Sequence, residues 1–159
     1  MTISTNQQNE LQTLAGRTLT STEITMANNR QDGSLAASLS VGLTEKASIS
    51  AMALDDWLAA NNLRGMIEDA AKTSGSTFYA TRRSQALAIL DIIQANISLD
   101  ISSSATGQAN LAMLNAWATP MTGETAAPLT SAQVAALIAL GTVVVTISTD
   151  QVSTILNGA

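Results

Sequence analysis

The sequence contains neither cysteine nor histidine in its 159 residues. Without cysteine, the chain can form no disulfide, no thiolate nucleophile and no thiolate metal site. Without histidine, it lacks the commonest transition-metal ligand and the usual general base of enzymes, which a serine nucleophile would need. We therefore expect that the protein is not an enzyme and that it holds no cofactor and no metal ion.

Charged side chains are scarce, and they are distributed unevenly along the chain. They make up 12% of the residues, about half of the ~25% that is typical of soluble domains. The formal net charge is -5, and no lysine or arginine follows Arg83. The 76 residues from Ser84 onward hold four charges, at Asp91, Asp100, Glu124 and Asp150. We expect no nucleic-acid partner, because phosphates require a positive surface. We expect other protein subunits to cover part of the low-charge surface, in a homo-oligomer or a larger assembly.

Long hydrophobic runs are also absent. The longest nearly apolar run covers residues 134–147 and is interrupted by Gly141, Thr142 and Thr146, whereas a membrane-spanning helix needs roughly 18–20 apolar residues. We expect no membrane span. The start of the chain lacks the basic and apolar segments of a signal peptide, so no standard export signal is expected. Aromatic side chains make up only 3% of the residues, so the core has to be built from aliphatic residues, alanine and methionine.

The chain length favours a single helical domain over residues 1–159, with little room for a second core. The hydroxyl-x-x-Glu/Gln pattern of a helix-capping box occurs three times, as Thr20 with Glu23, Thr130 with Gln133, and Ser148 with Gln151. The predicted fold class is all-α, a compact multi-helix bundle of about seven or eight short helices with one extended segment near the C-terminus.

Apolar spacing predicts which helix faces are buried. A helix beginning at Ser48 should bury the residues that recur at spacings of three and four, namely Ile49, Met52, Ala53, Trp57 and Leu58. The helix over residues 79–96 should be central, with a broad apolar face made of Ala80, Ala86, Leu87, Leu90, Ile93 and Ile97. Residues 74–76 read as a break, residues 119–128 as a loop, and Gly141 as a left-handed helix end.

The extended segment begins after Gly141 and is nearly all β-branched. One interpretation is a buried connector that leads to the last short helix. The other is a strand that pairs with another subunit, because an isolated strand leaves its backbone groups unpaired. Trp57 and Trp117 are either core residues or interface anchors. The interface candidates are Val143, Val144, Val145, Ile147, Trp117 and Trp57.

The adjacent charged pairs give little support for a chemical site. Neighbouring residues on a helix diverge by about 100°, so neither Asp55-Asp56 nor Glu68-Asp69 should form a shared catalytic or metal site. Arg82-Arg83 is the only pair of adjacent basic residues. It could bind an anion, but an ion pair with an acidic neighbour at the surface is the simpler interpretation.

Several stretches at the two ends of the chain form a recognisable set. They are residues 11–16 (LQTLAG), 19–24 (LTSTEI), 29–36 (NRQDGSLA) and 129–142 (LTSAQVAALIALGT), followed by an extended link and a short helix. Together they resemble small helical proteins encoded among the tail genes of tailed bacteriophages. The link departs from that pattern, because Val143, Val144 and Val145 replace a more proline-rich segment.

The resemblance implies a non-enzymatic structural or accessory component of a phage virion, associated with the tail. Such a protein would be made in the bacterial cytoplasm, be located in the virion, and act through protein contacts. The alternative is a small helical protein that binds or regulates a host factor. It would use an exposed groove or an acidic patch around Asp55, Asp56, Glu68 and Asp69.

Overall fold

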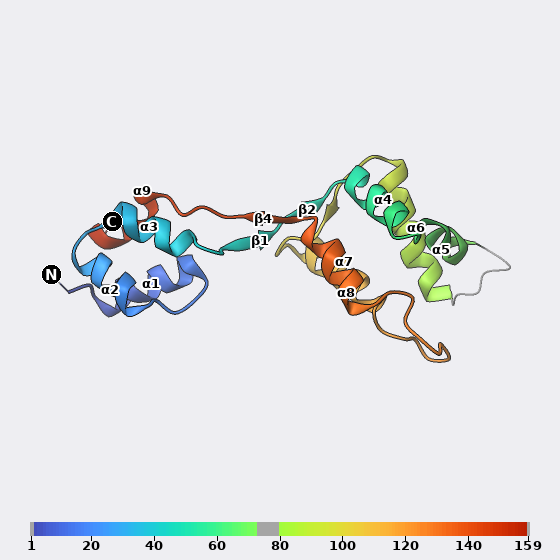
Figure 1. The fold of residues 1–159 in the computed structure, drawn as a ribbon, viewed down its shortest axis with the longest axis horizontal. Helices are drawn as coiled ribbons and strands as arrows, with labels where there is room; N and C mark the ends of the chain where they lie inside the picture. Colours follow the sequence, from blue (N-terminus) through green and yellow to red (C-terminus); the bar gives the residue numbers. More distant parts are fainter. Residues whose placement is uncertain (1, 73–79, 159) are drawn as a thin grey trace. The chain divides into compact units, whose positions relative to one another are not determined.

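The computed structural model describes residues 2–72 and 80–158 (Figure 1). Nine helices and four short strands lie in these residues, so the predicted mostly helical fold is confirmed and small strands are added to it. The break predicted at residues 74–76 lies outside the described part. The chain divides into two compact units: unit 1 is Met1–Glu45 with Val144–Ala159, and unit 2 is Lys46–Val143.

The buried hydrophobic residues form two separate clusters, one in each unit. This differs from the single core that the chain length favours. Chain length gives only an average domain size, and domains of about 60 residues can hold a core of their own. Unit 1 does so by drawing on both ends of the sequence, which a reading of consecutive segments does not reveal.

Unit 1 consists of four helices: α1 (Thr5–Ala15), α2 (Ser21–Asn28), α3 (Asp32–Ser40) and α9 (Thr149–Asn157). Helix α9 packs against both α3 and α1, and α2 packs against α3. Figure 1 shows these helices together in blue and red, the colours of the two ends of the sequence. Their core is aliphatic and includes Leu11, Leu19, Leu35, Leu39, Ile147, Val152 and Leu156.

Capping boxes fix the starts of three helices in unit 1. The boxes predicted at Thr20 with Glu23 and at Ser148 with Gln151 are both present, and Ser4 with Gln7 forms another before α1. The box predicted at Thr130 with Gln133 is also present, before α8 of unit 2. In each box the side chains and backbone N–H groups of the two residues satisfy one another, so these short helices need no distant partner at their first turn.

Unit 2 combines five helices with a short antiparallel strand pair. The strands β2 (Ser48–Ile49) and β3 (Leu99–Asp100) pair Ser48 with Asp100 and Ile49 with Leu99. The helices are α4 (Ala51–Ala60), α5 (Arg64–Ala71), α6 (Ala80–Gln94), α7 (Ala105–Ala116) and α8 (Ser131–Ala139). Strands β1 (Thr44–Lys46) and β4 (Thr142–Val144) form the other two-stranded sheet.

The predicted buried faces of two helices in unit 2 need correction. Helix α4 begins at Ala51, because Ile49 belongs to β2, and the buried face therefore passes through Ala51, Leu54 and Leu58. Met52 is 70% exposed. Helix α6 contacts α4 and α5. The face that it buries is narrower than predicted. Leu87 and Ile97, which were assigned to the apolar face, are exposed.

Gly141 does not form the predicted left-handed helix end, since its φ lies outside that region and Leu140 is the C-cap of α8. Its role is to allow close packing. A Cβ at this position would lie 2.8 Å from Ile101 Cδ1 and 2.8 Å from Ile49 Cγ1. Glycine is therefore required here because the β2–β3 pair lies directly against the backbone.

Candidate functional site

Arg82 lies in the first turn of α6 and is the centre of a buried hydrogen-bond network in unit 2. Its side chain is fully buried, whereas a surface ion pair was predicted. The guanidinium donates to both carboxylate oxygens of Glu124, at 3.1 and 2.7 Å, and to the carbonyls of Ala116 and Thr119, both at 2.7 Å. It also lies 5.4 Å from the centroid of the Trp117 ring. These contacts hold the loop that follows α7 against helix α6.

The Arg82 network leaves no basic pair for an anion. Arg82 is inaccessible, and the Nε of Arg83 donates to the carbonyl of Ala71 at 3.3 Å. The Arg82 guanidinium holds the pKa of Glu124 below its usual range, and the Met121 N–H adds to this effect. No local pattern indicates this pairing, because 42 positions separate the two residues.

Glu23 is the corresponding buried carboxylate of unit 1, with a side chain only 1% exposed. Arg17 donates to both of its oxygens, at 2.6 and 2.9 Å, and the Ser38 hydroxyl donates to Oε1 at 2.9 Å. The Thr20 N–H and hydroxyl both donate to Oε2. These hydrogen bonds, that of Arg17 above all, hold the pKa of Glu23 far below its usual range. Glu23 thus links the start of α2 to the end of α3. Its carboxylate is fully engaged and is not free to act as a catalytic group or a metal ligand.

Replacing Glu23 with glutamine should lower the free energy of unfolding of unit 1 by about 2 kcal/mol at neutral pH, because charge-assisted hydrogen bonds are lost. The native pKa is depressed, so the stabilisation is complete above the ordinary carboxyl pKa of about 4.3 and is lost as the pH falls below it. The free energy of unfolding of E23Q should therefore fall less than that of the wild type as the pH is lowered. Urea unfolding with amide hydrogen exchange of α2 and α3 at pH 7 and pH 3.5 measures this.

The control for this experiment is Glu45→Gln, because Glu45 is an exposed glutamate of unit 1. This change should leave the free energy of unfolding at pH 7 unchanged. If the free energy of unfolding of E23Q fell as steeply with decreasing pH as that of the wild type, the stabilising role of the Glu23 carboxylate would be contradicted.

Asp100 is likewise engaged in local structure. Its carboxylate accepts from the Ser102 N–H at 2.8 Å and from the Ser104 hydroxyl at 2.6 Å, which lowers its pKa. Ser104 is also the N-cap of α7. Together with Glu124, Asp100 accounts for two of the four charges in the C-terminal half, so this half has even less free charge than its composition indicates.

The predicted acidic patch is largely neutralised. Arg64 pairs with both Asp55 and Glu68, and Lys72 pairs with Asp69 at 2.7 Å. Asp56 remains exposed. In the part of the chain that the structure describes, no group of three or more acidic residues could hold a metal ion.

The six interface candidates occupy very different environments. Trp117 is buried in the core of unit 2, and Trp57 is half-buried against that core. Ile147 is buried in the core of unit 1, and Val145 is half-buried. Val143 and Val144 are 43% and 78% exposed. Within the extended segment, Thr142–Val144 forms the strand β4, which pairs with β1 of the same chain, and Ile147 is buried as expected of a connector. Pairing with another subunit stays a prediction.

Two neighbouring backbone segments of unit 1 carry its most exposed large hydrophobic residues. The Val145 N–H donates to the Leu43 carbonyl at 3.0 Å, and the Ile147 N–H donates to Ser40 Oγ at 2.8 Å. Val41 and Val144 on these segments are 76% and 78% exposed, the highest values for large hydrophobic residues in the described part of the chain. We call them the valine pair. Val41 was missed because it follows α3 directly and belongs to no periodic pattern.

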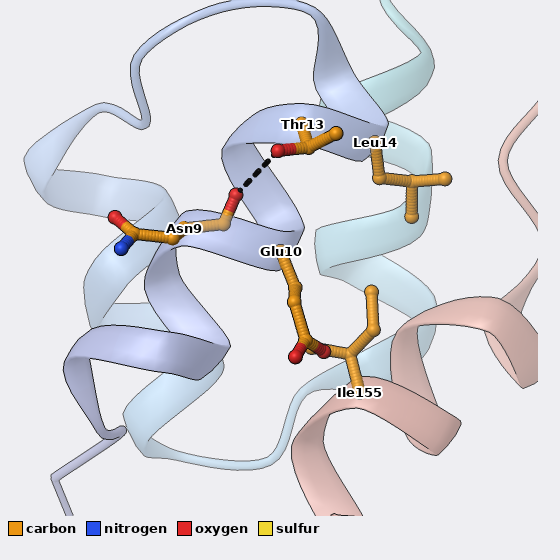
Figure 2. A pocket seen from close by; sticks show the side chains of 5 residues that line it. All are labelled: Asn9, Glu10, Thr13, Leu14 and Ile155. Carbon is orange, nitrogen blue, oxygen red and sulfur yellow. Dashed lines mark hydrogen bonds between the residues drawn. The ribbon is translucent and has the colours of Figure 1, made fainter.

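A surface groove lies between α1 and α9 (Figure 2). One hollow has a volume of about 370 Å³ and is lined by Asn9, Glu10, Thr13, Leu14 and Ile155. A second hollow of about 420 Å³ shares Glu10 and Ile155 with the first and adds polar groups of Gln7 and Thr154. Figure 2 shows the Glu10 side chain extending from α1 toward Ile155 on α9.

Comparison of the chain with family models, curated proteins and solved structures finds no match. Within the described residues, no helix is both long enough and apolar enough to cross a membrane.

Proposed function

We propose that the protein is a non-enzymatic structural or accessory component of a bacteriophage virion, associated with the tail, that acts through protein–protein contacts. The observation that carries the proposal of protein contacts is the valine pair, since Val41 and Val144 are 76% and 78% exposed on hydrogen-bonded segments. Exposed apolar side chains that lie together on one surface are typical of a site that another chain covers. The assignment to a phage tail rests on the resemblance of the two ends of the sequence.

The disposition of charge supports the same proposal. Glu23, Glu124 and Asp100 are held by hydrogen bonds that position loops and helix ends. The alternative of a host-factor binder with an acidic patch is weakened, because Arg64 and Lys72 pair with three of its four carboxylates.

The experiment is the mass of the native protein by light scattering after size exclusion, over a tenfold concentration range. The wild type should form a discrete oligomer. The double variant V41K/V144K should associate at least about 100-fold more weakly, because a buried unpaired charge costs about 3 kcal/mol or more. Point substitutions are preferable to truncation, since Ile147, Val152 and Leu156 belong to the core of unit 1.

The matched control is Met52→Lys, which places the same charge on an exposed hydrophobic residue of unit 2. It should leave the oligomer intact. A monomer at every concentration, or an oligomer that V41K/V144K does not weaken, would contradict the proposed role of the valine pair. Absence of the protein from purified particles, measured by mass spectrometry, would contradict the virion assignment.

A further inference from the structure

The α1–α9 groove of unit 1 has a hydrophobic part and a negatively charged part next to each other. Leu14 and Ile155 supply aliphatic surface to the first hollow. Glu10 lines both hollows and is exposed. In the described residues, no ion pair or hydrogen bond of its side chain is found. The carboxylate therefore remains available to a cation from outside the chain.

The last turn of α9 lies beside the start of α1 in the second hollow. Gln7 Nε2 donates to the Leu156 carbonyl at 2.7 Å and to the Ile155 carbonyl at 3.3 Å, which holds the last turn of α9 beside α1. The last turn of α9 contains no basic residue. The partial negative charge of the α9 C-terminus is offset by the partial positive charge of the α1 N-terminus in the same hollow, so the charge of the groove is that of Glu10. At this end, Arg30 donates a hydrogen bond to the Asn157 side chain at 3.3 Å.

These observations define the chemistry of the occupant. A lysine or arginine can lay its aliphatic stem on an apolar surface while its charged end reaches a carboxylate. Leu14 and Ile155 supply such a surface, and Glu10 lies between the two hollows. Small ligands prefer pockets that bury most of their surface, whereas both hollows of this groove are open to solvent. An extended protein segment suits that shape better.

We propose that the α1–α9 groove binds a segment of a partner protein in which a lysine or arginine lies next to an aliphatic residue. This inference rests on the proposed function, since it names a second contact surface and the chemistry of its partner. It differs from the valine pair, which offers no charge. The net charge of -5 favours the approach of a basic partner at low ionic strength.

The test is an NMR titration of the full chain with capped hexapeptides, in which the amide chemical shifts report binding. The basic peptide Ala-Leu-Lys-Leu-Arg-Ala is compared with versions that carry glutamine or glutamate at both charged positions. Saturable shifts should be confined to α1 and the last turn of α9, and only the basic peptide should produce them. Glu10→Lys should weaken its binding at least about tenfold, and Glu10→Gln less, because reversal adds repulsion to the lost attraction.

The matched control is Glu45→Lys, the same charge reversal at another exposed glutamate of unit 1, which should leave the affinity unchanged. Equal binding of the glutamine peptide, or unchanged binding by E10K, would overturn the inference. So would concentration-dependent shifts of the same residues without peptide, which would make a second copy the occupant. The mass of the same samples distinguishes a failure of this inference from a failure of the proposed function. If the protein is an oligomer but does not bind the basic peptide, only the proposed binding by the groove is refuted.

Discussion

Replacing Arg82 with methionine should lower the free energy of unfolding of unit 2 by about 3–5 kcal/mol, the largest effect that we expect from any single change. The substitution leaves the Glu124 carboxylate and the carbonyls of Ala116 and Thr119 without their guanidinium donor. Buried polar groups that lose their partner incur the full desolvation cost. Urea unfolding at pH 7, with hydrogen exchange of α6 and α7, would measure the loss.

Two further variants separate the ion pair from the rest of the network. Arg83→Met removes a neighbouring arginine with one long hydrogen bond to Ala71, and should cost under about 1 kcal/mol. The double variant R82M/E124M should recover part of the loss, because no charge is left without a partner. Full recovery would mean that the two carbonyls contribute little, and equal losses for R82M and R83M would refute the network.

Replacing Gly107 with alanine should destabilise unit 2 by about 3 kcal/mol, at the upper end of the range for overpacking. An added Cβ would lie 2.4 Å from the Ser102 carbonyl oxygen and 2.6 Å from the Ser102 nitrogen. These are backbone atoms, so no rotamer change can relieve the contact. The turn cannot move easily, since Asp100 holds Ser102 and Ser104 at 2.8 and 2.6 Å.

The control for this glycine is Gly65→Ala in α5, where nothing lies within 4 Å of an added Cβ. Alanine should stabilise α5 by about 0.5–1 kcal/mol, because glycine is the poorer helix former. Thermal unfolding by circular dichroism compares the two variants directly. Similar melting temperatures for G107A and the wild type would show that the turn before α7 adapts.

Local signals predicted the helix starts well. The boxes at Thr20, Thr130 and Ser148 are present because the two residues that form each box are only three positions apart. Ser4 and Gln7 form another capping box with the same spacing. Helix starts of this kind depend little on tertiary structure, which is why residue types at fixed spacing suffice to find them.

Features that depend on distant segments were predicted poorly. Because Ser48 and Ile49 form the strand β2, helix α4 starts later than predicted and Met52 is exposed. Strand β2 itself depends on pairing with β3 about 50 positions later. Arg82 was expected at the surface because charged residues rarely lie buried without a partner. Its partner Glu124 comes from a loop without periodic pattern. The α1–α9 groove could not be predicted either, because its two helices are at opposite ends of the sequence.

The order of segments in unit 1 also determines when it can fold during synthesis. The ribosome makes α1, α2 and α3 first, and it makes all of unit 2 before it reaches Val152 and Leu156 of α9. Chains lengthen by about 5–20 residues per second, so the first three helices wait for several seconds without their closing helix. Leu11, Leu35 and Leu39 are uncovered during this interval. Unit 2 is continuous in sequence and can fold meanwhile, so newly made chains should be vulnerable to aggregation through their N-terminal helices.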